Sequence, residues 1–420
     1  MKRHSALLPL IVGLTSCIPN QQYRVANPVL RETPPAYCPA ANGQFTLSFI
    51  EFDDMGELWS AKELDSAIAA IKSAKGKAPL VLIFIHGWKN NASDQSGNVW
   101  GFRCELGRIA NELNPLGRPV IGVYLGWRGD IVRGDTLKNL TFANRMTAAA
   151  RIPGAHMTGA ITQIMRETKG SDGKGDATLI VVGHSFGGLV LERAVTQALV
   201  ERIAQAGEGG DGIQFPADLV VCLNEAGPAL EAKQLLDLLW REHLGFSTRG
   251  GEQHPLLLSM TSEGDTATHL AFPGGQALSL LKVDLRKYDP PGDEFGITDQ
   301  TSYYLHTTAN TEALQSHVIA PTPNPAVDCT KPGVYTCATI PGGKTYTVSQ
   351  KAGAKNTTPY WAMQMPVEFV PDHTNIFRPE FDALLYAFLN KRPDMMKKMA
   401  PQLRATPTVT PEAPALRPKP

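Results

Sequence analysis

A serine flanked by glycines, set between a strand pattern and a helix pattern, constrains the fold of this chain most. Residues 178–182 form a largely apolar, β-branched run, which is typical of a strand buried on both faces. Residues 189–197 then show helical spacing. Between them, Gly183-His184-Ser185-Phe186-Gly187 has the pattern G-x-S-x-G. This pattern predicts a tight strand–turn–helix bend, with a strained serine whose Oγ projects above the sheet.

Strand patterns and helix patterns alternate along the rest of the chain. We expect strands over 44–52, 80–85, 119–127, 178–182, 218–224, 255–260 and 365–370, and helices over 60–74, 99–113, 155–165, 189–206, 229–243 and 378–389. The first strand alternates polar and apolar residues, so we expect a half-exposed edge strand. The alternation predicts an α/β protein with a doubly wound, mostly parallel sheet and helices on both faces. Ligands bind such sheets at the carboxyl ends of the strands.

Two motifs resemble those of a known superfamily. Gly183-His184-Ser185-Phe186-Gly187-Gly188 resembles the elbow of α/β-hydrolase-fold lipases and esterases, and His86-Gly87-Trp88 resembles their oxyanion-loop motif. The resemblance extends over roughly residues 45–392 and is interrupted by insertions. It implies the α/β-hydrolase fold, with insertions at the C-terminal strand ends, and a serine-hydrolase mechanism. It does not imply a particular substrate.

A serine nucleophile needs a base that takes its proton and an acid that orients the base. In the fold that the chain resembles, the order along the chain is serine, acid, histidine. His373 follows the last predicted strand, which favours it as the base over the other nine histidines. Asp265, in a glycine-containing loop after strand 255–260, is the predicted acid. Glu263 in the same loop and Glu225 after the preceding strand remain alternatives.

The negative charge that develops on the substrate oxygen needs two backbone N–H donors. Phe186, the residue after the nucleophile, is the first predicted donor. Trp88 is the second, because Gly87 allows the chain to turn and present the next N–H.

These residues predict a serine hydrolase that cleaves a carboxylic ester, from a small molecule or a lipid, through an acyl-enzyme. An amidase, thioesterase or acyltransferase with the same triad is an alternative, as is a non-catalytic hydrolase-fold binding lipoprotein. We expect no cofactor and no metal, because the sequence contains neither H-E-x-x-H nor C-x-x-C. Formal net charge is zero, which gives nucleic-acid binding no electrostatic support.

The N-terminus predicts export and a lipid anchor. Residues 1–16 have a basic start and a short apolar run, as in a signal peptide. Leu14-Thr15-Ser16-Cys17 resembles a bacterial lipobox, which implies cleavage before Cys17 and lipid attachment to it; an ordinary signal peptide is the alternative. Ile18 at the second mature position favours the outer membrane, so we expect a lipid-anchored protein of the bacterial cell envelope. Residues 17–43, rich in Pro, Asn and Gln, are predicted to be a tether.

The remaining cysteines and the insertions complete the domain organisation. Four cysteines are available to pair in an oxidising compartment: we pair Cys329 with Cys337, and Cys38 with Cys104 as a weaker inference. Cys222, within a strand pattern, is predicted to be a buried thiol. The hydrolase domain is expected over 44–392, with an insertion at about 270–360 that forms either a lid or cap or a distant decoration. Residues 393–420 are predicted to be a proline-rich disordered tail.

Overall fold

The computed structural model describes residues 17–26, 28–38, 41–170, 175–206, 217–241, 254–279, 284–322, 329, 331 and 333–391. The predicted signal peptide, 1–16, and the predicted tail, 393–420, lie outside the described residues. Among the described residues, no helix has the length and apolar character needed to cross a membrane.

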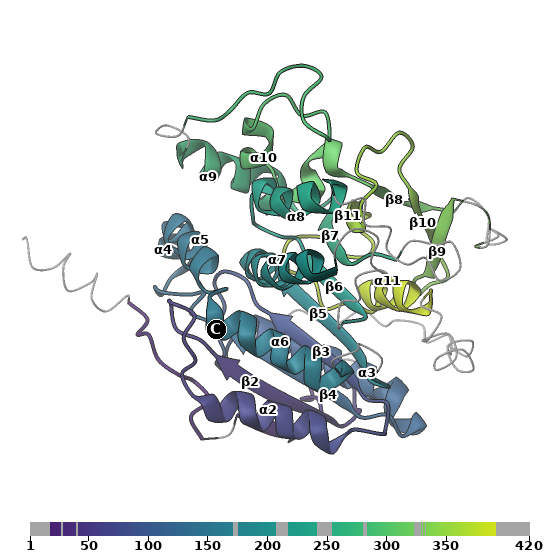
Figure 1. Ribbon diagram of the computed structural model, residues 1–420. Coiled ribbons are helices and arrows are strands. Elements are labelled where there is room, and N and C mark those ends of the chain that lie inside the picture. Colours follow the sequence, from purple (N-terminus) through teal and green to yellow (C-terminus); the bar gives the residue numbers. More distant parts are fainter. Residues whose placement is uncertain are drawn as a thin grey trace, which may run out of the picture.

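A mostly parallel sheet of eight strands forms the centre of the molecule (Figure 1). Its strands lie in the order β1-β2-β4-β3-β5-β6-β7-β11. Their bounds are β1 Val29–Glu32, β2 Phe45–Glu51, β3 Leu80–Ile85, β4 Val120–Gly126, β5 Thr178–His184, β6 Leu219–Leu223, β7 Leu257–Ser262 and β11 Tyr360–Met365. Strand β1 pairs antiparallel with β2, and the other neighbours pair in parallel. The predicted α/β class and mostly parallel sheet are confirmed.

Helices cover both faces of the sheet because its central strands are apolar on both sides. In β3, Val81, Ile83 and Ile85 belong to one hydrophobic cluster, while the alternating residues Leu80, Leu82 and Phe84 belong to the other. Helices α2 (Ala61–Ser73), α5 (Phe142–Arg151), α6 (Ala155–Lys169), α7 (Phe186–Ala206) and α8 (Ala229–Arg241) pack into the first cluster, and α3 (Gly97–Leu113) and α11 (Pro379–Asn390) into the second.

The predicted insertion extends both layers. Its elements are a π-helix (Ala267–Ala271), α9 (Phe272–Ser279), α10 (Thr301–Leu305), β8 (His317–Pro321), β9 (Val334–Thr339) and β10 (Thr345–Gln350). The last three form an antiparallel sheet of their own, in the order β8-β10-β9, which the sequence patterns did not predict. Tyr303 belongs to the first hydrophobic cluster and Tyr346 to the second. The insertion therefore packs as a continuation of the domain on the side of α8 and α11 (Figure 1).

The prediction that residues 44–52 form a half-exposed edge strand was wrong. Six of the seven residues of β2 are buried, and β1 pairs with its outer side, with Leu30 opposite Leu47. The polar residue Glu51 is buried because the backbone N–H groups of Tyr23 and Arg24 donate hydrogen bonds to its carboxylate. The polar residues of this strand therefore contact the N-terminal segment, and they do not face solvent.

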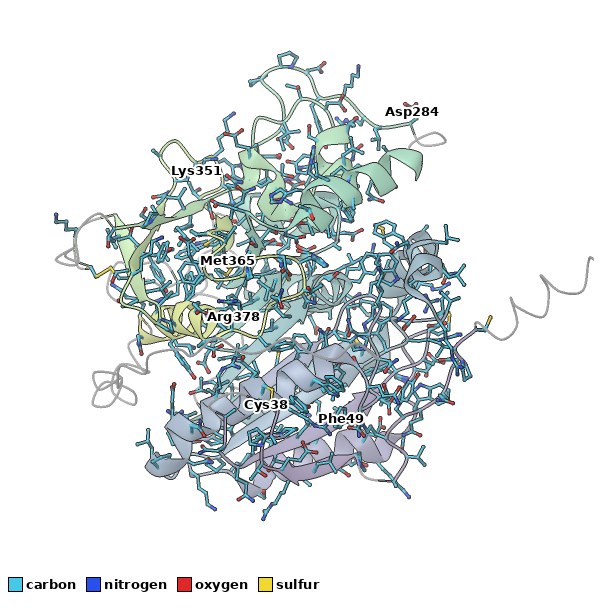
Figure 2. The ribbon with its side chains drawn as sticks, turned by 180° about the vertical axis from the view of Figure 1, so that it is seen from behind. Cys38, Phe49, Asp284, Lys351, Met365 and Arg378 are labelled. Carbon is cyan, nitrogen blue, oxygen red and sulfur yellow. A yellow bond between two sulfur atoms is a disulfide. The ribbon has the colours of Figure 1, made fainter. Side chains whose placement is uncertain are left out.

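The N-terminal segment is packed on the domain, in contrast to the predicted free tether. Besides β1, it is joined to α3 by the disulfide Cys38–Cys104, with sulfurs 1.99 Å apart. Figure 2 shows Cys38 on the same part of the molecule as Phe49 of β2. The pairing of Cys329 with Cys337 is also confirmed, and Cys222 is buried as a thiol. Proline-rich composition predicted an unpacked linker, but apolar residues between the prolines add to the sheet.

The last predicted strand is displaced. Residues 365–370 were expected to be extended, whereas β11 ends at Met365. Pro366 has no N–H to donate to a neighbouring strand, and the chain turns there: the Phe369 N–H donates to the Pro366 carbonyl over 3.1 Å, as in a turn. His373 therefore lies in a longer loop, between Met365 and Arg378, which Figure 2 labels.

Candidate active site

Ser185 lies in the bend between β5 and α7, at the centre of the sheet. Its φ of 57° lies in the left-handed region, which a serine occupies only when its surroundings impose it. Gly183 and Gly187 make this bend possible: a Cβ on Gly183 would lie 2.3 Å from the Gly187 carbonyl oxygen. The Ser185 N–H donates to the Leu223 carbonyl (3.1 Å), and the Ala226 N–H donates to the Ser185 carbonyl (3.1 Å). Strand β6 and the residues after it thus fix the backbone of the serine.

The structure brings Ser185, His373 and Asp265 together, although 188 positions separate the first two. His373 Nε2 lies 2.9 Å from Ser185 Oγ, and His373 Nδ1 lies 2.9 Å from Asp265 Oδ2. The Ser185 hydroxyl can donate to Nε2 while Nδ1–H donates to the carboxylate. Asp265 is fully buried, Ser185 is 5% exposed, and the His373 side chain is 21% exposed. The histidine is therefore the solvent-facing member of the three.

Asp265 is held as a carboxylate. Burial alone would raise its pKa, but hydrogen bonds from His373 and Thr268 outweigh burial, so its pKa lies below the ordinary value. The Thr268 hydroxyl donates to Oδ2 (2.8 Å), and the N–H groups of Ala267 and Thr268 donate to Oδ1 (2.9 and 3.1 Å). An ionised Asp265 keeps the hydrogen of His373 on Nδ1, which leaves Nε2 free to accept the serine proton.

Two buried side chains hold the loop that carries His373. His184 Nε2–H donates to the His373 carbonyl over 2.7 Å, and Asn224 Nδ2 donates to the carbonyls of Asp372 (3.1 Å) and His373 (3.4 Å). Burial, and then the charge of His373, lower the pKa of His184 to about 3, so His184 is neutral at physiological pH. Asn224 has a φ of 45° and accepts a hydrogen bond from the Ser262 N–H (2.9 Å).

Sequence reasoning missed these two positioning residues. His184 was considered only as a competing base, and Asn224 only as the end of a predicted strand. Their positions carried a signal all the same. His184 is the last residue of β5 and Asn224 directly follows β6, the adjacent strand, so their side chains reach the edge of the sheet where the His373 loop returns.

The two predicted oxyanion donors lie on either side of the serine. Phe186 is the first residue of α7, and the first N–H groups of a helix have no acceptor within the helix. The Gly87–Trp88 segment packs on the serine, since a Cβ on Gly87 would lie 2.6 Å from Ser185 Cβ. Lys89, at φ 66°, donates its N–H to the Gly129 carbonyl (2.8 Å) and so fixes the end of this loop.

His86 holds the Gly87–Trp88 segment through a hydrogen bond. Burial lowers its pKa to about 4, so the ring is neutral. Its Nδ1–H donates to the Gly87 carbonyl (2.9 Å), and its Nε2 accepts the Trp127 N–H (3.0 Å). The ring also stacks on the Trp127 ring at 5.5 Å between centroids. A residue considered as a competing base is therefore a fixed support of the oxyanion loop.

An aromatic cluster joins Trp88 and Phe186, the two predicted oxyanion donors, to α5 and α9. Phe142, at the start of α5, lies 5.3 Å from Phe186 and 5.5 Å from Trp88 between ring centroids, and 6.3 Å from Phe272 of α9. Phe186 and Phe272 are buried. Trp88 and Phe142 are its partly exposed members.

The alternative acids occupy different positions. Glu263 is exposed on the loop after β7. Glu225 is fully buried on the other side of the elbow, beside Gly188 and Glu192, and burial together with Glu192 raises its pKa well above the ordinary range. Asp265 is thus the acid that hydrogen-bonds His373.

Comparisons with protein-family models, curated proteins and solved structures found no match to this chain. Within the described ranges, no three His, Cys, Asp or Glu side chains gather as ligands for a metal ion. The chemistry open to the site is therefore inferred from its own geometry: a hydroxyl, an imidazole and a carboxylate in series, next to two backbone amides.

Proposed function

We propose that this protein is a serine hydrolase of the α/β-hydrolase type that cleaves carboxylic esters. The observation that carries the proposal is the hydrogen-bonded series Ser185–His373–Asp265 at the carboxyl ends of β5 and β7, with Ser185 in a left-handed bend. Catalytic triads are recognised by such geometry and by the roles of their members. The strand order and the two sequence motifs support the same proposal.

The reaction follows from the positions of these groups. Ser185 Oγ attacks the ester carbonyl carbon while its proton passes to His373 Nε2, and the backbone N–H groups of Trp88 and Phe186 stabilise the oxyanion. Asp265 stabilises the imidazolium that forms. The proton on Nε2 then passes to the leaving alkoxide, which gives an alcohol and an acyl-enzyme. Water, deprotonated by His373, hydrolyses the acyl-enzyme and restores the serine hydroxyl.

The two partly exposed rings of the aromatic cluster support an apolar acyl group. Trp88 carries one proposed oxyanion donor, and the Phe142 ring lies 5.5 Å from the Trp88 ring. An amide or a thioester could be attacked by the same groups. Hydrolysis rates of an ester, an amide and a thioester with the same acyl chain therefore identify the preferred leaving group.

Covalent labelling tests the nucleophile directly. A fluorophosphonate probe should modify Ser185, located by peptide mapping, and Ser185→Ala should remain unmodified. Hydrolysis of p-nitrophenyl esters should fall by about 10⁴-fold or more in Ser185→Ala. Equal hydrolysis by both proteins, or labelling at another residue, would overturn the proposal.

A further inference from the structure

The loop that carries Asp265 continues into the π-helix Ala267–Ala271, and the side chains of this helix contact Asp265. The Phe272 N–H donates to the Ala267 carbonyl, which closes the wide turn of a π-helix. Such turns are rare and are frequently found at functional sites. The N–H and the ring Nδ1 of His269 lie 3.1 and 2.8 Å from the Asp265 carbonyl oxygen. His269 therefore holds the backbone of the residue whose carboxylate Thr268 holds.

The partners of the His269 ring define where its hydrogen lies. A carbonyl oxygen can only accept, so Nδ1 carries the hydrogen that the Asp265 carbonyl receives. The ring Nε2 lies 3.2 Å from the amide nitrogen of Gln364, which donates to it. The two partners together select one tautomer, with the hydrogen on Nδ1. That tautomer is the one that can hold the Asp265 backbone.

Gln364, near the end of β11, joins this histidine to the insertion. Its amide nitrogen also donates to Asn310 Oδ1 over 3.2 Å. Asn310 is the last residue of the short 3-10 helix Thr308–Asn310, which belongs to the insertion. The side chains of His269, Gln364 and Asn310 are all half-buried. A continuous series of hydrogen bonds therefore leads from the insertion to the backbone of Asp265.

We propose that His269 is a positioning residue for Asp265, and that the insertion, through Asn310 and Gln364, holds His269 in the tautomer that this role requires. The inference rests on the proposed function, in which Asp265 orients His373. The insertion was expected to be a lid, a cap or a distant decoration. This part of it instead supports the acid of the triad.

The expected effect of His269 is on the rate of the reaction. The Asp265 N–H donates to the Ser262 carbonyl over 3.0 Å, so with His269 in place both backbone groups of Asp265 are held. Without the histidine, the Asp265 carbonyl loses a donor and the carboxylate is less well aimed at His373. Small misplacements of a catalytic group are costly to the rate. Substrate binding should be unchanged, because His269 acts behind the triad.

Kinetics of p-nitrophenyl ester hydrolysis test this role in the full chain. His269→Ala should lower kcat by about tenfold or more and leave KM unchanged. Rates are expressed per active site titrated with a fluorophosphonate, so that unfolded protein does not contribute. His269→Asn should recover most of the lost rate, since its amide can donate to the same carbonyl. Gln364→Leu, which keeps the histidine, should lower kcat in the same direction and provides the test if His269→Ala does not fold.

His317→Ala is the matched control. His317 is also a buried histidine of the insertion, but its ring stacks on Trp361, at the start of β11, with 3.6 Å between centroids, and its Nδ1 bonds the Ser316 hydroxyl (2.9 Å). Its variant should lose stability in urea unfolding and keep kcat. An unchanged kcat in His269→Ala or in Gln364→Leu would overturn the proposal. So would an equal fall of kcat in His317→Ala.

Nitrogen NMR of the full chain labelled at histidine tests the tautomer without relying on catalysis. The His269 ring, identified by the signals that His269→Asn loses, should carry its hydrogen on Nδ1 and none on Nε2 at neutral pH. A hydrogen on Nε2 alone would overturn the proposal. The expected tautomer in a protein whose Ser185 is not labelled by the fluorophosphonate would instead reject the proposed function and leave the hydrogen-bond series in place.

Discussion

The backbone of Ser185 is strained, and its neighbours offset the cost. A non-glycine residue in the left-handed region costs about 1–2 kcal/mol. Hydrogen bonds from Ser185 N–H to Leu223, and from Gly188 and Ala226 to the Ser185 carbonyl, hold that conformation. The position of the hydroxyl is therefore set by backbone contacts, and the other members of the site must be brought to it. This arrangement makes the contributions of Asp265 and Asn224 separable by substitution.

Asp265→Asn should remove most of the activity and leave the fold intact. The amide has nearly the shape of the carboxylate, but it can donate to His373 Nδ1 and so favours the tautomer with hydrogen on Nε2. That tautomer cannot accept the serine proton, and we expect kcat/KM to fall by about 10³–10⁴-fold. The exposed Glu263, on the same loop, gives the matched control Glu263→Gln, which should keep its activity. A larger loss of kcat/KM in Glu263→Gln than in Asp265→Asn would show that Asp265 is not the acid.

Asn224→Asp tests whether the carbonyl contacts position His373. The aspartate can still accept from the Ser262 N–H, but it cannot donate to the carbonyls of Asp372 and His373. We expect kcat/KM to fall by about tenfold or more, because small misplacements of a catalytic group are costly. The new charge should also move the pH–rate profile upward, by favouring protonated His373.

Asn356→Asp is the matched control for that substitution. Asn356 is equally buried, accepts from the Thr358 N–H and donates to the carbonyls of Leu314 and Tyr360, but it lies at the opposite end of β11. Its variant should lose stability in urea unfolding and keep the pH–rate profile. If both variants show the same unshifted profile, the role of Asn224 is structural only.

At the scale of elements, a carboxyl pair joins α7 to β6 and β11 behind the elbow. Glu192 of α7 and Glu225 after β6 are both fully buried, and Glu192 hydrogen-bonds the hydroxyl of Tyr360 of β11. Burial raises the pKa of Glu192 to about 7, and burial together with the charge of Glu192 raises the pKa of Glu225 well above its ordinary value. Both carboxyls are therefore stable in the fold as neutral acids, and neither suits the role of a charged catalytic acid.

The stability of the fold should consequently decline as the pH rises. A carboxyl whose pKa is higher in the folded state stabilises the fold fully below its unfolded pKa of about 4.3 and loses that contribution as the pH passes the folded value. Between pH 5 and pH 8 the free energy of unfolding should fall by roughly 1–3 kcal/mol more in the wild type than in Glu192→Gln. Urea unfolding at the two pH values measures this difference. Glu231→Gln, a partly exposed glutamate of α8 paired with Arg193, is the control. Parallel pH dependence of all three proteins would contradict the expectation.

Elements with strong local patterns were predictable, and those defined by distant partners were not. The run 80–85 and residues 179–182 of the elbow strand are apolar throughout, so their burial on both faces follows from composition. The end of β11 was placed too late because Pro366-Val367-Glu368-Phe369-Val370 alternates like a strand, although its proline cannot pair. Strands β8, β9 and β10 have mixed polarity. Their burial comes from distant partners that no local pattern reveals: β9 packs on α11, β8 on β11, and Tyr346 of β10 on Phe369. The triad was predictable because chain order and strand ends constrain it jointly.

At the scale of the whole molecule, the N-terminal segment packs across the surface of the domain. Cys17 at its start pairs with Val132, and Tyr23 contacts the carboxylate of Glu51. Further along, Arg24 forms an ion pair with Asp94 in the loop before α3, and Glu32 forms one with Arg103 of α3. None of these partners is near in sequence. A composition of Pro, Asn and Gln therefore predicted a linker, whereas contacts over long separations make the segment part of the fold.

The two disulfides should differ in how much they stabilise the protein. In the chain-entropy account, a cross-link stabilises by restricting the unfolded chain, and the effect grows with the closed loop. Cys38–Cys104 closes a separation of 66 residues and Cys329–Cys337 one of 8. These separations correspond to about 4 and about 2.5 kcal/mol. The free energy of unfolding, measured in urea, should therefore fall more in Cys38→Ala/Cys104→Ala. A larger fall in Cys329→Ala/Cys337→Ala would contradict this expectation.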